Sequence, residues 1–169
     1  FAINRETGEI DPSVVDNIPG LDALKDADLM VVYTRFRRLP EEQMAKFVDY
    51  VNSGRPVIGI RTATHAFSYD KFQTEKFSEW GWRGPHPTFQ GGFGRQVLGE
   101  TWINHYGGYR TQSTLGIAVP EMKDHPILRG IDRLWGLSHA YAVTPLEGDS
   151  RPLVLGQPLL GLRPTDKPD

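Results

Sequence analysis

Three histidines and one glutamate are the side chains of this sequence best suited to moving protons. His65 follows a short apolar segment, His105 precedes the flexible pair Gly107-Gly108, and His139 begins a predicted strand. Imidazole exchanges protons near neutral pH, and Glu100 adds a carboxyl group a few residues before His105. We therefore predict His65, His105 and Glu100 as catalytic residues and His139 as a substrate-binding residue. A structural role stays open for each histidine, and an ordinary exposed side chain is the alternative for Glu100.

Cofactor chemistry is limited by the residues that the sequence lacks. Cysteine is absent, which excludes disulfides, thiolate zinc sites, iron–sulfur ligation and cysteine nucleophiles. No phosphate-binding P-loop, dinucleotide motif or HExxH pair is present. We expect no cofactor and assign no metal ligands. Dispersed histidines meeting around a divalent metal are the less favoured alternative.

The charge of the chain is nearly balanced, with 19 Lys and Arg against 21 Asp and Glu. The cluster Arg35, Arg37 and Arg38 is shorter than the tracts that form nucleic-acid patches, so we predict no nucleic-acid partner. A solvated or anion-holding loop is the better interpretation, and we assign Arg35 to substrate binding. The longest apolar run, Leu29 to Tyr33, is far too short to span a bilayer, so we expect a soluble chain without a membrane span.

The elements that would position these residues follow an α/β pattern. The apolar runs Leu29 to Tyr33 and Pro56 to Ile60 predict two parallel strands buried on both faces. Between them, Pro40, two glutamates and an apolar stripe predict a helix that ends at Gly54. The length of 169 residues predicts one domain. Ligands in parallel sheets bind beyond the carboxyl ends of the strands, which places the loops containing Arg35 and His65 at the site.

The other elements predicted from the sequence are shorter. Short apolar segments bounded by proline and glycine predict later strands, and aromatic residues at helical spacing predict a further helix. We expect strands over 1–3, 115–119, 141–143 and 153–155, and helices over 22–25, 69–80 and 95–99.

The segment from Pro56 to His65 resembles the strand and nucleophile elbow of class I glutamine amidotransferases. Arg61 stands where that family has its cysteine. A guanidinium stays protonated and cannot attack an amide, so we predict that the chain is not a glutaminase. The resemblance implies that Thr62 and Thr64, together with Arg61, hold a carbonyl or anionic oxygen of the substrate.

The chain as a whole is similar to the trehalose-utilisation, or ThuA-like, family. The matching pieces are the elbow up to Phe67, the run from Phe93 to His105, and the segment from His125 to Ile131; Trp135 to Tyr141 matches a strand-edge segment. This resemblance implies a three-layer, mainly parallel, flavodoxin-like α/β fold of the class I glutamine amidotransferase-like kind. It implies one domain over 1–169 that lacks its first and last strand–helix pairs. Many members of that family have His at the position of Arg61 and Asp at the position of His65, so the polar side chains of the elbow differ in this chain.

The resemblance also implies a role in carbohydrate utilisation. We predict that the chain acts on or binds a sugar or oxidised glycoside, as a hydrolase or isomerase, with Tyr141 among the substrate-binding residues. The alternative is a non-catalytic protein-interaction module with a vestigial pocket. Homo-oligomerisation stays open, and the family favours an extracytoplasmic location only slightly, so the location stays unassigned.

Overall fold

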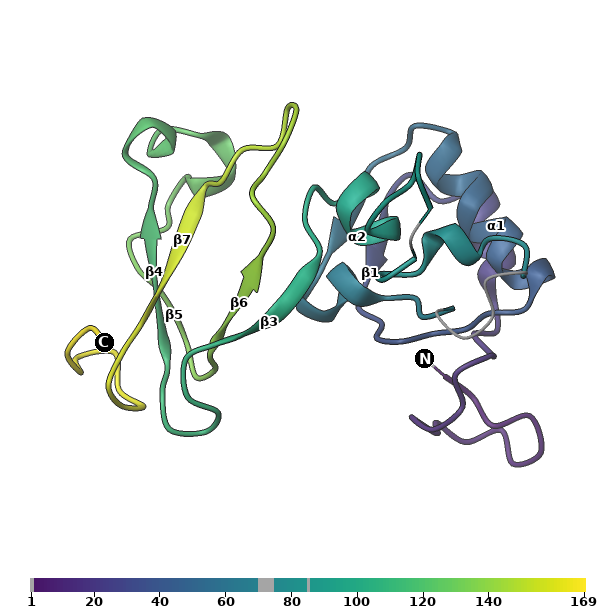
Figure 1. Cartoon of the computed structure of the whole chain (residues 1–169), viewed down its shortest axis with the longest axis horizontal. Helices are drawn as coiled ribbons and strands as arrows, with labels where there is room; N and C mark the ends of the chain where they lie inside the picture. The colour runs from purple at the N-terminus through teal and green to yellow at the C-terminus, as the bar shows by residue number, and fades with distance from the viewer. Residues whose placement is uncertain (1, 70–74, 85) are drawn as a thin grey trace. The chain divides into compact units, whose positions relative to one another are not determined.

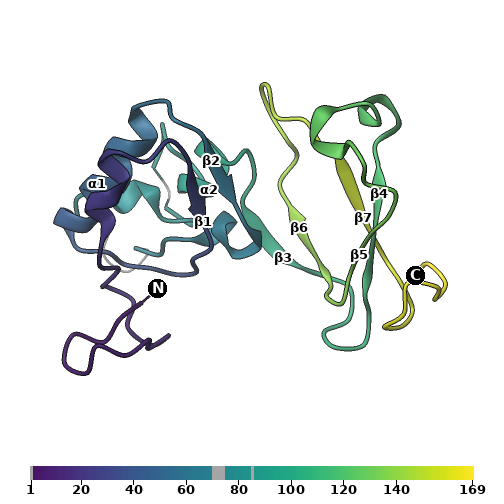
Figure 2. The same ribbon diagram turned by 180° about the vertical axis from the view of Figure 1, so that it is seen from behind.

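The computed structural model describes residues 2–69, 75–84 and 86–169, which form two compact units. Unit 1 is Phe1–Thr101 and unit 2 is Trp102–Asp169. Figure 1 labels α1, α2 and the strands other than β2, which Figure 2 labels, and each unit is described by itself. The expectation of a single ThuA-like domain stays a prediction.

The described residues of unit 1 form one parallel strand pair, two α-helices and three 3₁₀ helices. In chain order these are η1 (Leu21–Lys25), β1 (Met30–Val32), α1 (Glu41–Asn52), β2 (Val57–Gly59), η2 (Arg61–His65), η3 (Ser78–Trp80) and α2 (Gly92–Val97). Figure 2 shows β1 and β2 side by side, with Val31 paired to Ile58. The predicted strand–helix–strand order and the parallel pairing are confirmed.

Helix α1 forms where the sequence predicts it and contributes four buried residues to the unit 1 core: Met44, Phe47, Val48 and Tyr50. Pro40 precedes it in extended conformation, two glutamates stand in its first turn, and Gly54 follows it at φ 74°. The acidic first turn is favourable at the positive end of the helix dipole. Phe47 packs edge-on against Phe67 and Phe93, at ring-centroid distances of 4.9 and 5.1 Å. The core of unit 1 is therefore an aromatic cluster beneath one face of β1.

The prediction that both faces of β1 and β2 are buried is wrong. Met30 and Val32 are buried, but Val31 and Tyr33 are 55 and 66% exposed, and Ile58 is 50% exposed. The two strands form a two-stranded sheet, so each is an edge strand. An apolar run indicates only that a strand prefers burial. Burial of both faces requires a layer of other secondary-structure elements on each side of the sheet. Helix α1 packs on one face, and the described residues of unit 1 provide no second α-helical layer.

Unit 2 is built from antiparallel strands. They are β3 (Trp102–Tyr106), β4 (Thr114–Ala118), β5 (Leu134–Gly136), β6 (Ala140–Val143) and β7 (Val154–Pro158), with the 3₁₀ helices η4 (Pro120–Met122) and η5 (Pro126–Leu128) between β4 and β5. Strand β3 pairs with β6, and β4 lies between β5 and β7. The later strands are thus confirmed in position, with boundaries shifted by a few residues.

The expected three-layer, mainly parallel, flavodoxin-like and amidotransferase-like fold is contradicted by these sheets. The only parallel strand pair in the described residues is β1–β2, and all pairing in unit 2 is antiparallel. The strands of unit 2 form two small antiparallel sheets, β3–β6 and β5–β4–β7, and unit 1 contributes one two-stranded parallel sheet. Residues 70–74 of the helix predicted over 69–80 lie outside the described residues, and the rest forms only η3. The described chain is mostly β and low in helix.

Candidate functional site

The pairing of β3 with β6 brings two predicted site histidines together. His105 lies opposite Tyr141, and His139 stands two residues before Tyr141. His139 directly precedes β6, and the ring contacts of His105 with both His139 and Tyr141 place the three side chains on the same side of the pair. His105 Nδ1 is 2.6 Å from His139 Nε2, and the two rings meet edge to face at a centroid distance of 4.3 Å. His139 is 4% exposed, whereas His105 is exposed.

A β-bulge adds an indole to this group. Trp102 and His105 are three residues apart and would face opposite sides of a regular strand. The register shifts between Trp102 and Asn104, and an extra residue of this kind re-aims the side chains beside it. The Trp102 ring consequently lies 5.4 Å from the His105 ring and 6.2 Å from the Tyr141 ring.

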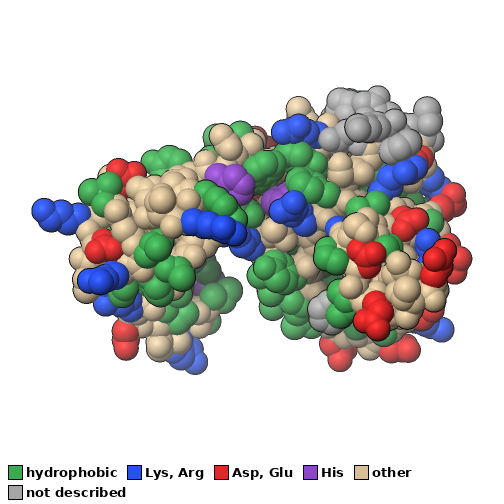
Figure 3. Space-filling view, turned by 90° about the horizontal axis from the view of Figure 1, so that it is seen from below, with side chains coloured by type: hydrophobic (Ala, Val, Ile, Leu, Met, Phe, Trp, Pro, Cys, Tyr) green, Lys and Arg blue, Asp and Glu red, His purple; other side chains and the backbone are tan. Residues whose placement is uncertain are grey.

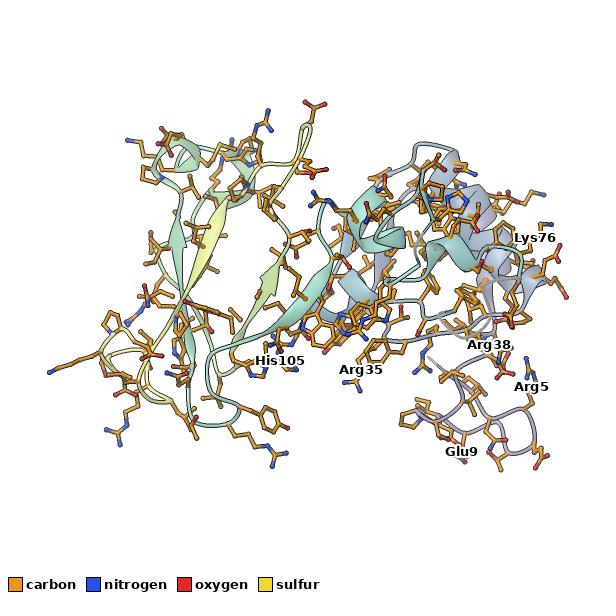
Figure 4. The ribbon with its side chains drawn as sticks, in the orientation of Figure 1. Arg5, Glu9, Arg35, Arg38, Lys76 and His105 are labelled. Atoms are coloured by element: carbon orange, nitrogen blue, oxygen red, sulfur yellow. The ribbon has the colours of Figure 1, made fainter. Side chains whose placement is uncertain are left out.

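A second phenol approaches from the turn after β3. The Tyr109 ring is 5.7 Å from the His139 ring. The turn needs Gly107, whose φ is 102° and where an added Cβ would stand 3.3 Å from the His139 Cβ. We call the residues Trp102, His105, Tyr109, His139 and Tyr141 the histidine–aromatic cluster; Figure 4 labels His105 within it. Trp102 and Tyr109 are not among the site residues predicted from the sequence, and the Gly107-Gly108 turn was the only signal for Tyr109.

The cluster has the groups needed for proton transfer. A hydrogen bond between two imidazole nitrogens requires one to carry the proton and the other to offer a lone pair. The buried His139 therefore fixes which nitrogen of His105 is engaged, and Nε2 of the exposed His105 is the nitrogen outside this bond. A histidine oriented in this way acts as acid or base when a hydroxyl comes within about 3 Å of it.

The elbow segment in unit 1 makes a sharp turn from strand to helix. Arg61 directly follows Ile60 at the start of η2 and has a φ of 42°, the left-handed region that non-glycine residues rarely adopt. Nucleophile elbows place their reactive side chain at a strained turn of this kind. The Arg61 side chain is exposed, whereas Thr64 is buried and Thr62 is half-buried. Thr64 Oγ1 lies 3.2 Å from His65 Nδ1.

His65 is an interior residue of unit 1 and is only 3% exposed. Its ring contacts those of Phe36 and Trp82, at centroid distances of 5.0 and 6.0 Å, and these two rings lie 5.6 Å from each other. Its backbone carbonyl accepts a hydrogen bond from the Phe36 N–H at 3.0 Å, which ties the elbow to the loop after β1. Arg35 enters the same group because its guanidinium lies 5.0 Å from the centre of the Phe36 ring.

Glu100 is the partly buried carboxyl group near the elbow. Burial raises the pKa of Glu100 above its ordinary value, which favours the protonated acid. The Glu100 N–H donates to the Gly94 carbonyl at 3.1 Å. Gly94 also packs against the Thr64 carbonyl, so the glycine joins Glu100 and the elbow through the backbone.

The structure thus groups the predicted site residues by unit. His105, His139 and Tyr141 lie together in unit 2, and unit 1 holds Arg35, Arg61, Thr62, Thr64, His65 and Glu100. The role of each stays a prediction.

Over the residues described, no group of three or more His, Cys, Asp or Glu side chains is arranged to hold a metal ion. No helix in this part of the chain is long and apolar enough to cross a membrane. Figure 3 shows acidic and basic side chains interspersed with hydrophobic ones over one face.

Comparison with known proteins gives no match: neither a protein-family model nor a curated protein nor a solved structure is similar to this chain.

Proposed function

We propose that the chain binds a sugar or an oxidised glycoside at the histidine–aromatic cluster and transforms it by proton transfer, as a hydrolase or isomerase does. The observation that carries this proposal is the 2.6 Å contact between His105 Nδ1 and His139 Nε2 amid three aromatic rings. The buried His139 holds the exposed His105 in one orientation, which is what a general acid or base requires.

Aromatic side chains beside hydrogen-bonding groups suit a sugar ring. The C–H faces of a pyranose are apolar and stack on indole or phenol rings, while its hydroxyl groups need polar partners. Trp102 and Tyr141 offer rings next to His105, and imidazole nitrogens can donate to or accept from a hydroxyl. The choice of a sugar over other polyhydroxy compounds rests on the resemblance of sequence motifs to the ThuA-like family, and no family model matches the chain. Participation of His65 and Glu100 remains a prediction from the sequence.

A titration with trehalose tests the binding step. The intact chain, labelled with ¹⁵N in its histidines, is titrated with trehalose and, separately, with glucose, while the imidazole resonances are recorded. We expect saturable shifts at His105 and His139 and none at His86, which is exposed in unit 1. His105→Ala should weaken binding, and His86→Ala is the matched control. Saturable shifts at other histidines only, or no shifts with either sugar, would contradict the proposed site.

The chemical step has its own measurement. Release of reducing sugar from trehalose, or exchange of sugar C–H protons with deuterated solvent, should be detectable with the wild-type chain. His105→Ala should abolish the signal while leaving the far-ultraviolet circular dichroism unchanged, because His105 is exposed. Binding without either reaction would limit the proposal to a sugar-binding module.

A protein-interaction module is the second candidate function. The outer face of the β1–β2 sheet favours it, because neighbouring large apolar side chains there are exposed: Leu29, Val31, Tyr33, Ile58 and Ile60. A contiguous exposed apolar patch is more often a site of protein–protein contact than a sheet face that stays exposed to solvent. Sedimentation velocity of the wild type and Val31→Lys separates the cases. Self-association that Val31→Lys removes would support the interaction module, and a monomer in both would count against a homo-oligomer.

A further inference from the structure

Unit 1 contains a cavity that the histidine–aromatic cluster does not use. Its volume is about 540 Å³, and small-molecule sites span about 300 to 1,000 Å³. It lies between the N-terminal segment, η1, β1 and α1, and most of its lining is apolar, including Ile18, Leu21, Met30, Val32, Phe47 and Phe67. A ligand with an apolar body fits these walls, whereas a sugar would leave most of its hydroxyl groups without partners.

The polar groups of the cavity are gathered where β1 ends. Thr34, Arg35 and Arg37 are all part of the lining. Thr34 Oγ1 is buried and has no hydrogen-bond partner among the residues that the structure describes. A buried hydroxyl without a partner destabilises the fold, and a ligand oxygen would relieve this by accepting its hydrogen bond.

The two arginines provide positive charge that carboxylates of the described chain do not neutralise. Arg38, next in sequence, pairs with Glu75 at 2.5 Å, but the ion pairs of the described residues include neither Arg35 nor Arg37. Figure 4 labels Arg35 and Arg38 on the segment after β1. Burial, followed by the positive charge of Arg35, lowers the pKa of Arg37. An anion beside these guanidinium groups would relieve that repulsion.

Arg37 also frames the cavity. Its guanidinium donates to the backbone carbonyls of Arg35, Val14 and Pro12, at 2.8, 2.6 and 3.4 Å. These bonds hold the N-terminal segment against the loop after β1. In the described structure the Arg35 guanidinium contacts the Phe36 ring and donates no hydrogen bond to a backbone carbonyl. Its N–H groups can therefore bind an incoming anion.

We propose that this cavity binds a small carboxylate with an apolar body, whose head group contacts Arg35 and Thr34 and whose body packs against β1, η1 and Phe47. The cavity lining includes Arg35, which the sequence analysis assigns to substrate binding, but no residue of the histidine–aromatic cluster.

Decanoate and its uncharged counterpart decanamide test this proposal with the intact chain. Binding is followed by amide chemical shifts and by titration calorimetry. We expect saturable decanoate binding with shifts at Met30, Val32 and Phe47, and weaker binding of decanamide. Arg35→Gln should weaken decanoate binding by about tenfold or more, because a charge-assisted hydrogen bond is lost. Arg129→Gln, which removes one exposed arginine from unit 2, should leave the affinity unchanged.

Thr34→Val separates the contribution of the Thr34 hydroxyl to binding from that of the Arg35 charge. Valine keeps the shape of threonine but cannot donate, so decanoate should bind more weakly while the unfolding midpoint of the free chain does not fall. Equal affinities for decanoate and decanamide would overturn the proposal, as would an Arg35→Gln affinity equal to that of wild type. Absence of saturable binding, or shifts confined to unit 2, would overturn it as well. Excess trehalose should not displace decanoate, which keeps this test distinct from that of the sugar site.

Discussion

Replacing Gly94 by alanine should destabilise unit 1, although the same change usually stabilises a helix. Alanine in a helix interior is favoured over glycine by about 0.5–1 kcal/mol, because glycine loses more backbone freedom on folding. Gly94 is buried within α2. A Cβ added there would stand 2.2 Å from the Thr64 carbonyl oxygen and 2.8 Å from the Glu100 carbonyl oxygen. Both neighbours are backbone atoms, so neither can move aside by changing a rotamer.

The expected magnitude follows from these distances. The elbow backbone would have to move by about 0.8 Å to restore the 3.0 Å that real Cβ contacts respect. Overpacking costs about 1–3 kcal/mol for each displaced contact, and two backbone segments must shift here. After subtraction of the gain in helix propensity, we expect a net loss of about 3 kcal/mol. With a urea dependence of about 1–3 kcal/mol per molar, the midpoint for unit 1 should fall by at least about 1 M.

Pulsed hydrogen exchange in urea measures this effect for each unit separately. Peptides from α2 and the elbow should lose protection at lower urea in Gly94→Ala, and peptides from β4 and β7 serve as an internal reference. Gly136→Ala is the matched control, because nothing lies within 4 Å of a Cβ added at Gly136. That control should be neutral or slightly stabilising. If Gly94→Ala is as stable as wild type or more stable, the tight contact between α2 and the elbow is refuted.

Three further changes have defined outcomes. Met44→Ala should lower the free energy of unfolding of unit 1 by about 2–5 kcal/mol in urea denaturation, because Met44 is 0% exposed beneath β1; a loss under about 1 kcal/mol would contradict this packing. Ser113→Ala should cost unit 2 about 1 kcal/mol, since the fully buried hydroxyl donates to the Gly161 carbonyl at 2.8 Å; an unchanged midpoint would show that this bond contributes nothing. Burial raises the pKa of Glu100 above 4.5, so the native state binds that proton more tightly and stability falls as pH rises from 4.5 through the raised value. Glu100→Gln should flatten this part of the stability–pH curve, and an unchanged slope would mean that Glu100 is not responsible.

Local elements were predictable because their signals are contained in short segments. The proline, the acidic first turn and the closing glycine of α1 are all within sixteen residues of one another, and the structure confirms the helix. The pairing of β1 with β2 was predictable as well, since a twelve-residue helix between two apolar runs is the connection that parallel strands require. The positions of β4, β6 and β7 followed from the same kind of local pattern.

The sheet architecture and the histidine contact were not predictable in this way. The apolar runs of β1 and β2 have the same appearance whether one face or both are covered, and only the packing of other layers decides between these cases. His105 and His139 are 34 residues apart, and no spacing rule joins them. Their contact depends on the antiparallel register of β3 with β6, and the position of Trp102 depends on a bulge in that register.

The amino-acid sequence by itself determined which chemistry is available: no thiol, an arginine where an elbow would need a nucleophile, and a few histidines able to move protons. It also determined the approximate positions of α1 and of strands β1, β2, β4, β6 and β7, because helix capping, turn residues and apolar periodicity act over a few neighbouring residues. Only the tertiary structure decided which of those histidines meet, which strand faces remain exposed and where a cavity opens beside Arg35. These outcomes depend on contacts between segments distant in sequence, whose free energy is set by the register and packing of the folded chain.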